Sequence, residues 1–365
     1  MNKTYHHILY QDSRNLKSLK DNSVDLIITS PPYPMIKMWD SLFTELNPEI
    51  NENQIENSSE IAFENMHKEL DKVWKECSRV LKDNRFICLN IGDSTRTVNN
   101  NFNLFSNHSR IIQFFQKENF TVLPMILWHK QTNSPNKFMG SGMLPGGAYV
   151  TLEHEYILIF RKNSKREFKS LKEKELRRES SFFWEERNNW FSDIWKDLKG
   201  VKQKIENNNK VRSRSAAFPF ELAYRLINMY SVKNDTILDP FLGTGTTSIA
   251  TISSERNSIG VEYDNEFFST IYESLINSKN VLNDFLNTRL LKHLQFVKNR
   301  LAQNKNLKYF NLFHNFEVMT NQETDLKIRF LKNIEYKDNI FTTEYFDENL
   351  QTDKEIMEKL NISSI

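Results

Sequence analysis

Along the first 270 residues, apolar and polar positions alternate between a strand-like and a helix-like pattern. Short runs rich in β-branched and aromatic residues, at 5–10, 24–29 and 85–91, predict strands. Apolar residues recur at helical spacing over 62–81, before the third of these runs, and over 109–120, after it, which predicts helices. Strands that alternate with helices are typical of a mostly parallel sheet with helices on both faces. The pattern therefore predicts an α/β fold.

The rest of the chain extends this prediction. Further strands are expected at 121–130 and within 149–162, the latter as one long strand or a pair. Pro219 opens a predicted helix, and another helix is expected from about 275 to 305, with mixed structure beyond it. Three segments are predicted as connections: a short helical turn at 12–23, an Asn-rich loop at 50–60 and a glycine-rich mobile loop at 140–147.

The predicted strand at 24–29 has an unusual end. It runs into Ser30-Pro31-Pro32-Tyr33, and two consecutive prolines allow neither a strand ladder nor a helix to continue. Such an end is either a plain strand exit or one wall of a site that holds a flat ring.

A glycine loop, Gly243-Thr244-Gly245, lies between a later predicted strand and a predicted helix. Glycine lets the backbone turn tightly and approach a ligand, and the first amides of the helix are free donors for a carboxylate or phosphate. Glu262 ends the next predicted strand, 17 residues after Gly245, where an acid can accept both hydroxyls of a ribose. A tight turn alone would explain the glycines, but the position of Glu262 favours a cofactor that contains a nucleoside.

The loop fits two common phosphate-binding motifs poorly. A dinucleotide fingerprint requires a third glycine where Ser248 stands, and a P-loop requires a lysine where Thr246 stands. S-Adenosylmethionine is easier to place, because it has an adenosine for the Glu262 side and a carboxylate for the loop side. Both special loops follow predicted strands, and ligands of parallel sheets bind at the carboxyl ends of strands. We therefore expect the two loops to share one crevice.

The two motifs together resemble the β-class amino-methyltransferases of DNA, and among them the cytosine-N4 enzymes. The segments that carry the resemblance cover most of residues 8–270: "QDSRNLKSLKDNSVDLIITSPPY", "SRVLKDNRFICLNIGDS", "LEHEYILIFRK", "FPFELAYRLI" and "DPFLGTGTTSIA" with "IGVEYD". Gln11 and Asn84 stand where that class usually has glycine. The resemblance implies a Rossmann-like methyltransferase fold, circularly permuted, with a seven-stranded, mostly parallel sheet and an accessory DNA-recognition region.

The same resemblance implies roles for individual residues. Catalysis falls to Ser30, Pro31, Pro32 and Tyr33: the serine hydroxyl and the Pro31 carbonyl accept the hydrogens of an exocyclic amino group, and Tyr33 offers a ring face to the flipped base. The nitrogen then attacks the sulfonium methyl directly. Contacts with S-adenosylmethionine are implied for Asp12, Ser215, Phe218, Pro219, Asp239, Phe241, Gly243, Thr244, Gly245, Thr246, Thr247 and Glu262. Ordinary core packing would also explain Phe218 and Phe241.

Charge is uneven along the chain. Residues 161–214 carry 17 Lys or Arg against 9 Asp or Glu, whereas the whole chain has a net charge of +2. This stretch is either a solvated helix face or a surface for a polyanion, and the resemblance places target recognition in it. Its tryptophans either pack this region or wedge into DNA.

The predicted units of the chain are a catalytic half at 1–160, a recognition region at 161–212, a cofactor-binding half at 213–275 and an extension of unknown role at 276–365.

Composition excludes several other classes. Cys77 and Cys88 lie in apolar contexts without metal-ligand spacing, so we expect buried thiols, a reducing compartment and no metal. The first residues lack the apolar core of a signal peptide, and no segment has the roughly 18 apolar residues of a membrane span. The expected setting is the cytoplasm, and the expected partner is double-stranded DNA. A cognate restriction endonuclease fits this class, while the oligomeric state is left open.

Rival functions share parts of these motifs. Adenine-N6 methylation is the nearest, although those enzymes more often have Asp or Asn at the position of Ser30. Methyltransferases of RNA or protein usually place the cofactor motif before the Pro-Pro-Tyr motif, the reverse of the order here. A Rossmann-type dehydrogenase and a DNA-binding subunit without catalysis are further alternatives, and both would leave one of the two motifs without a purpose.

Overall fold

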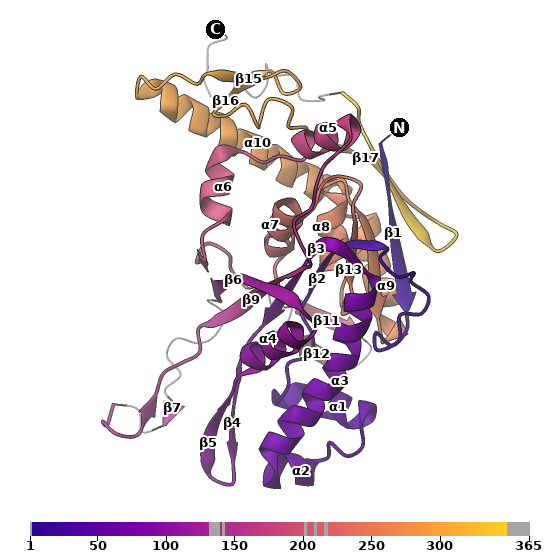
Figure 1. Cartoon of the computed structure of the whole chain (residues 1–365), viewed down its shortest axis with the longest axis vertical. Coiled ribbons are helices and arrows are strands. Elements are labelled where there is room, and N and C mark those ends of the chain that lie inside the picture. Colours follow the sequence, from indigo (N-terminus) through magenta and orange to yellow (C-terminus); the bar gives the residue numbers. More distant parts are fainter. Residues whose placement is uncertain are drawn as a thin grey trace.

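The computed structural model describes residues 2–130, 139–140, 143–200, 203–207, 210–214 and 218–348. Its centre is a ten-stranded sheet in the order β10-β6-β9-β3-β2-β13-β14-β1-β18-β17 (Figure 1). These strands are β1 (Lys3–Tyr10), β2 (Val24–Thr29), β3 (Leu81–Ile91), β6 (Phe120–His129), β9 (His154–Lys162), β10 (Ile194–Trp195), β13 (Thr236–Asp239), β14 (Asn257–Glu262), β17 (Leu331–Lys337) and β18 (Ile340–Tyr345). The five strands from β3 through β2, β13 and β14 to β1 pair in parallel, so their carboxyl ends lie at one edge.

Helices cover both faces of the sheet, as the sequence pattern predicts. Neighbouring residues of β2 alternate between two apolar clusters: Leu26 and Ile28 belong to one, and Ile27 belongs to the other. The first cluster includes α7 (Phe220–Tyr230), α8 (Thr246–Ile252), α9 (Phe268–Ile276) and α10 (Lys279–Ala302). The second includes α1 (Asp40–Leu46), α2 (Glu52–Asn57), α3 (Ser59–Val80) and α4 (Asn107–Lys117). A strand buried on both faces explains why three consecutive residues of β2, Leu26, Ile27 and Ile28, are all apolar.

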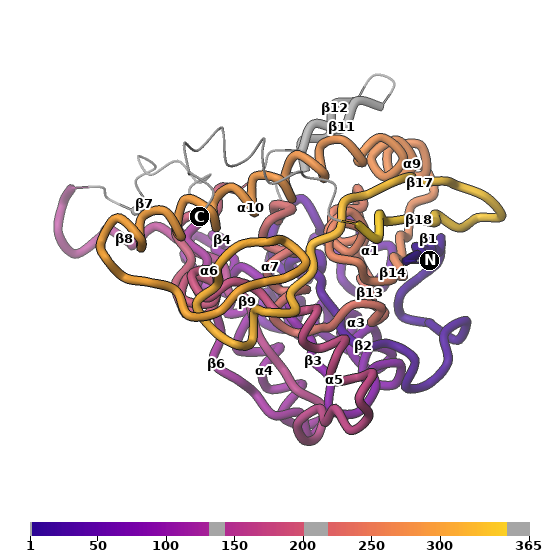
Figure 2. The backbone as a smooth tube through the Cα atoms, turned by 90° about the horizontal axis from the view of Figure 1, so that it is seen from above, coloured from indigo at the N-terminus to yellow at the C-terminus, as the bar shows by residue number. Residues whose placement is uncertain are grey.

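The predicted seven strands account only for the centre of this sheet, so the strand count needs correction. That seven-stranded centre runs from β6 to β1, but β10 adds a strand at one edge and β18 with β17 extends the other. The N-terminal β1 and the C-terminal β18 pair antiparallel, with His6 opposite Phe341, and Figure 2 shows these two strands side by side. Pairing by the C-terminal segment covers an edge that would otherwise expose unpaired backbone groups.

Two predicted connections also need correction. The segment at 12–23 forms successive turns without a helix, and Leu16 anchors it in the core. The Asn-rich segment at 50–60 contains α2 and the start of α3. The side chain of Asn51 accepts a hydrogen bond from the backbone amide of Gln54 at 3.0 Å and so caps α2. Asparagine is a loop former and also a helix cap, which is why composition alone gave the wrong assignment.

Smaller elements lie outside the sheet. They are the two-stranded pairs β4 (Ser94–Val98) with β5 (Asn101–Phe105), β7 (Met139–Gly140) with β8 (Ala148–Tyr149), β11 (Gln203–Asn207) with β12 (Lys210–Arg214) and β15 (Tyr309–Asn311) with β16 (Phe316–Val318). The stretch between β9 and β11 contains α5 (Leu171–Glu179) and α6 (Trp184–Trp190). Of the predicted loop at 140–147, residues 141–142 lie outside the described residues.

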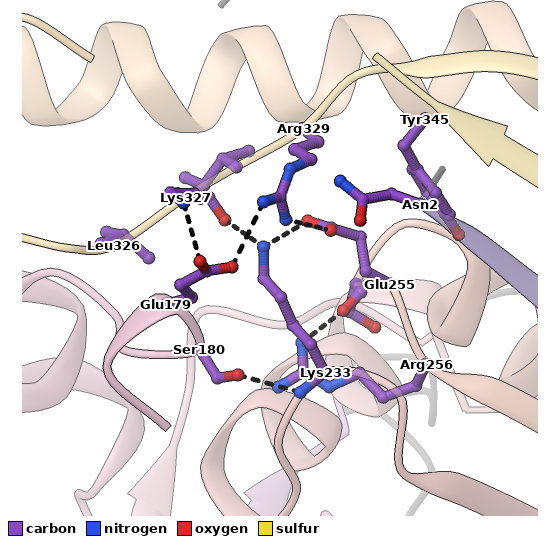
Figure 3. A network of polar contacts seen from close by, with 12 residues as sticks. Asn2, Glu179, Ser180, Lys233, Glu255, Arg256, Leu326, Lys327, Arg329 and Tyr345 are labelled. Carbon is purple, nitrogen blue, oxygen red and sulfur yellow. Dashed lines mark hydrogen bonds and ion pairs between the residues drawn. The ribbon is translucent and has the colours of Figure 1, made fainter. Parts of the chain in front are cut away.

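A network of buried and half-buried charges ties the C-terminal extension to the rest of the fold (Figure 3). Arg329 donates to Glu255 at 2.7 Å and to Glu179 at 3.2 Å, while Lys233 pairs with Glu255. Lys327 pairs with Glu179 at 2.7 Å. Burial lowers the pKa of Lys233 to about 8, although the carboxylate of Glu255 acts in the opposite direction. Four sequence regions therefore meet at these ion pairs: the end of α5, the loop between α7 and β13, the loop between α8 and β14, and the chain before β17.

A second set of contacts joins α10 to α6. Arg289 forms a paired hydrogen bond with the carboxylate of Glu186 at 2.6 and 2.7 Å, and His293 lies 2.7 Å from a carboxylate oxygen of Glu185. The extension thus packs against the predicted recognition region as well as against the sheet.

Candidate active site

A cavity of about 1120 Å³ lies at the carboxyl ends of β1, β2, β13 and β14. Its wall includes Ser30 from the loop after β2 and Gly243 from the loop after β13, although the two residues are far apart in sequence. The prediction that the two loops share one crevice is confirmed. It holds because parallel neighbouring strands bring their carboxyl ends to one edge.

Asp239, the last residue of β13, connects the two loops through hydrogen bonds. One oxygen of its buried carboxylate accepts from Thr29 Oγ1 at 2.8 Å and from the Phe241 amide at 3.0 Å, and the other accepts from Thr247 Oγ1 at 2.5 Å. Burial raises the pKa of Asp239 to about 6, although these three donors act in the opposite direction. The carboxylate fixes the residue before Ser30 relative to the start of α8.

The glycine loop has the geometry that its sequence requires. Gly243 and Gly245 have φ of 58° and 91°, in the left-handed region that favours glycine. The Glu262 carboxylate accepts from the Gly243 amide at 2.8 Å and from the Asp264 amide at 3.1 Å. Glu262 therefore braces the loop, and it also lines the cavity.

Gly260 shows how closely the loop lies on the sheet. A Cβ atom at this position of β14 would lie 2.4 Å from Leu242 Cδ2 and 2.7 Å from Leu242 Cδ1. Leu242 is buried directly before Gly243, and its amide donates to the Val261 carbonyl at 2.9 Å. Only glycine at 260 lets the loop take this position without displacing Leu242.

We expect Gly260→Ala to lower the free energy of unfolding by about 1–3 kcal/mol through overpacking. Leu242→Ala alone should cost about 2–5 kcal/mol because it leaves a cavity. The double variant removes the collision and should lose clearly less than the sum of the two single losses. Urea unfolding of the four proteins measures this coupling, and strictly additive losses would contradict it.

The predicted catalytic residues divide into two groups. Ser30, Pro31 and Pro32 line the cavity. Tyr33 does not: its side chain is only 3% exposed, and its ring lies against Gly92, where a Cβ would come within 3.1 Å of Tyr33 Cε2. The Tyr33 ring is therefore buried beside the cavity, and its contact with the target base stays a prediction.

The predicted cofactor residues divide in the same way. Residues that line the cavity are Asp12, Phe218, Asp239, Phe241, Gly243, Thr244, Thr246 and Glu262. Gly245 and Thr247 are buried beneath the loop, and Pro219 precedes the first residue of α7 as its N-cap. Phe241 also packs edge-on against Trp74, with ring centroids 5.9 Å apart. Ser215 lies outside the described residues.

The ion pairs that Arg14 forms in the cavity wall were not predicted from the sequence. Arg14 binds Asp12 at 2.7 Å and Glu69 of α3 at 2.7 Å. Partial burial acts to raise the pKa of Asp12, but the hydrogen bonds and charge of Arg14 outweigh it and lower that pKa. The spacing of Asp12 and Arg14 was a local signal for this pair, whereas Glu69 is brought in only by the packing of α3.

The family model described as DNA methylase matches residues 24–273, more than half of the chain. The chain belongs to this DNA methylase family. Type II methyltransferase M.MthZI of Methanothermobacter thermautotrophicus is 48% identical to it over 362 residues, which cover 99% of this chain and 100% of that protein. Type II methyltransferase M.MjaI of Methanocaldococcus jannaschii is 48% identical over 294 residues, 77% of this methylase and 95% of the relative.

Solved structures agree with this assignment. A protein of Thermus thermophilus, described as a putative DNA modification methylase and crystallised with S-adenosyl-L-methionine, is 30% identical with a TM-score of 0.57. The match covers 73% of this methylase and 92% of that chain. The cytosine-N4-specific PvuII DNA methyltransferase has a TM-score of 0.53 at 16% identity, over 79% of this chain and 93% of the other, which supports the fold alone. The Rossmann-like methyltransferase fold is thus confirmed.

Two predicted absences concern metals and membranes. In the part of the chain that the structure describes, no group of three or more His, Cys, Asp or Glu side chains is arranged to hold a metal ion. No helix within those same ranges is long and apolar enough to cross a membrane. Cys77 and Cys88 are both buried free thiols, as expected.

Proposed function

We propose that this methylase transfers a methyl group from S-adenosylmethionine to the exocyclic N4 amino group of cytosine in duplex DNA. Membership of the DNA methylase family makes the chain a DNA methyltransferase. The observation that carries the finer proposal is the position of Ser30: a neutral hydroxyl, beside two prolines, lies in the same cavity as the Glu262-braced glycine loop.

The residues of the cavity fit S-adenosylmethionine. Glu262 offers carboxylate oxygens at the end of β14, where ribose hydroxyls can donate to them. Asp12 adds a second acid for the adenosine side, and Phe218 and Phe241 add apolar surface to the wall. When bound, the cofactor supplies an electrophilic methyl group on a sulfonium. Its presence in the crystals of the 30% identical relative from Thermus thermophilus supports the same use here.

On the target side, the chain has to accept hydrogens from an amino group. That nitrogen is a weak nucleophile because its lone pair is delocalised into the ring. The Ser30 hydroxyl and the Pro31 carbonyl accept its hydrogens and free the lone pair, and the two prolines hold the carbonyl in a fixed direction. Most of the rate enhancement then comes from positioning the nitrogen and the methyl group.

The target base has to leave the duplex to reach this cavity, at a cost of a few kcal/mol. We assign DNA contact to the predicted recognition region at 161–212 because of its local excess of positive charge. The 48% identical relatives are both named type II methyltransferases, which supports a place in a type II restriction-modification system. A cognate endonuclease that cleaves unmethylated DNA is part of this proposal.

Identifying the methylated nucleoside tests this function. Unmethylated DNA is incubated with the purified protein and isotopically labelled S-adenosylmethionine, digested to nucleosides and analysed by mass spectrometry. We expect labelled N4-methyldeoxycytidine. Ser30→Ala should lower its rate of formation by about 10²-fold, which also excludes a contaminating methylase. Labelled N6-methyldeoxyadenosine would refute the choice of cytosine, and no transfer at all would refute the function.

A further inference from the structure

A chain of buried polar groups runs from the cavity wall across four neighbouring strands. Ser30 Oγ lies 3.1 Å from Tyr33 OH, and Tyr33 OH lies 3.0 Å from Glu155 Oε2. Lys130 Nζ lies 2.7 Å from Glu155 Oε1. Asn90 Nδ2 donates both to Tyr33 OH, at 2.9 Å, and to Glu155 Oε2, at 2.7 Å. These residues belong to β9 and β3 and to the ends of β2 and β6, which are adjacent in the sheet.

Apart from Ser30, the members of this network are buried, so each hydrogen bond that is lost costs free energy. The exposed fractions are 2% for Asn90, 3% for Tyr33, 6% for Lys130 and 8% for Glu155. Gly92 permits the close packing, since a Cβ there would lie 3.1 Å from Tyr33 Cε2 and 3.3 Å from Glu155 Cγ. A buried polar group that loses its partner costs about 1–3 kcal/mol, so the protons in such a network have preferred positions.

Those positions follow from the donors and acceptors present. Glu155 is paired with Lys130, and an ionised carboxylate only accepts hydrogen bonds. The Tyr33 proton is therefore donated to Glu155, because a bond to a charged acceptor is about twice as strong as one to a neutral hydroxyl. The Tyr33 oxygen has two lone pairs, and Asn90 occupies one of them. The other is left for the hydroxyl proton of Ser30.

We propose that Glu155 is a positioning residue that, through Tyr33, turns the Ser30 hydroxyl proton away from the cavity. The lone pairs of Ser30 then face the target, ready to accept a hydrogen from the amino group. This inference rests on the proposed function and adds to it a reason why a neutral hydroxyl can act as an acceptor. It also gives Tyr33 a task that suits a buried ring, because the task needs only the phenol oxygen.

Glu155→Gln reverses this arrangement. Lys130 only donates, so the amide oxygen of a glutamine has to face Lys130. The amide nitrogen then points at Tyr33 OH and at Asn90, whose own amide has to turn so that its Oδ1 accepts from that nitrogen. Tyr33 accepts from that nitrogen and donates its own proton to Ser30. Ser30 in turn directs its proton into the cavity, against the hydrogens of the amino group. We expect kcat to fall by about 10²-fold while the dissociation constant for S-adenosylmethionine is unchanged.

Tyr33→Phe provides the decisive comparison. Without the phenol oxygen, Ser30 is neither held nor reversed, and its hydroxyl can still rotate to accept, so we expect a loss of only about 10-fold. The double variant Tyr33→Phe with Glu155→Gln cannot pass the reversal on to Ser30. Its kcat should therefore be higher than that of Glu155→Gln alone and close to that of Tyr33→Phe. A purely structural role of Glu155 predicts the opposite, because two defects in one core add up.

The experiment measures single-turnover methylation rates, cofactor affinity by calorimetry and thermal unfolding for the wild type and these three variants. Glu153→Gln is the matched control: it lies two residues from Glu155, its side chain is 47% exposed, and its rate should equal that of the wild type. A double variant slower than Glu155→Gln would overturn the inference. A wild type that transfers no methyl group to DNA would instead overturn the proposed function.

Discussion

Acidification from pH 6.5 to pH 4 is expected to destabilise this fold steeply, because three buried histidines have to take up protons. Burial lowers the pKa of His6, His67 and His314 to about 3, and each of these side chains is at most 1% exposed. The unfolded chain binds these protons near the ordinary pKa of 6.5, so between pH 6.5 and 3 it binds more protons than the folded state. Stability is therefore lost as the pH falls through this window.

The expected magnitude is large. At pH 5 each histidine should cost about 2 kcal/mol relative to neutral pH, or about 6 kcal/mol for the three. Asp239 acts in the opposite direction: its raised pKa of about 6 means that the folded state gains a proton first. That gain is only about 1 kcal/mol at pH 5. The net loss approaches the whole stability of an ordinary domain.

Urea unfolding at half-unit pH steps measures this loss, and His67→Gln tests its cause. Asn107 Nδ2 donates to the carbonyls of Pro34 and Gly92, so Asn107 Oδ1, 2.9 Å from His67 Nε2, is the acceptor of that pair. A glutamine amide can donate in the same place but does not titrate. On acidification, the free energy of unfolding of this variant should fall less steeply than that of the wild type, by about 1.4 kcal/mol per pH unit. An unchanged slope in His67→Gln would contradict the explanation.

Glu262→Ala is expected to weaken the binding of S-adenosylmethionine by about 10²-fold, or about 3 kcal/mol. The substitution removes the acceptor for the Gly243 and Asp264 amides, which are held at 2.8 and 3.1 Å. It also removes the carboxylate proposed to accept the ribose hydroxyls. The glycine loop then loses its brace at the same time as the cofactor loses a hydrogen-bonding partner.

Isothermal titration calorimetry with S-adenosylmethionine measures the effect. Glu266→Ala is the matched control, since it removes an exposed carboxylate four residues away, and its dissociation constant should equal that of the wild type. Glu262→Gln separates the two contributions, because its amide keeps one oxygen for a backbone donor but loses the charge. Equal affinities for Glu262→Ala and the wild type would show that the ribose lies elsewhere.

Prediction from sequence succeeded where the signal is local and periodic. The strand at 24–29 was recognisable because a strand buried on both faces has consecutive apolar residues, here Leu26 to Ile28, and β2 spans 24–29. The loop of Gly243 and Gly245 was recognisable because positive φ selects glycine. That both loops share one cavity was also predictable, since parallel topology brings carboxyl ends together.

Prediction failed where a residue type suits two different local structures, or where its partner lies far away along the sequence. Asn51 was assigned to a loop but caps a helix, because its side chain can serve either structure. The burial of the Tyr33 ring was not predicted, because the pattern of a motif does not say on which side of the backbone a ring lies. Strands β17 and β18 were missed because nothing near residue 340 indicates that the edge of β1 is vacant.

The sequence by itself determined the fold class, the two motif loops and their common edge, because hydrophobic period and glycine backbone geometry are properties of short segments. Only the tertiary structure decided which polar groups meet. Arg14 pairs with Glu69, and Tyr33 pairs with Glu155, across 55 and 122 residues of chain. Such pairs form because packed helices and strands bring their side chains within hydrogen-bonding distance in a dry interior. No pattern in either segment encodes the other, and so the direction of the Ser30 proton depends on a carboxylate that the sequence places in a different motif.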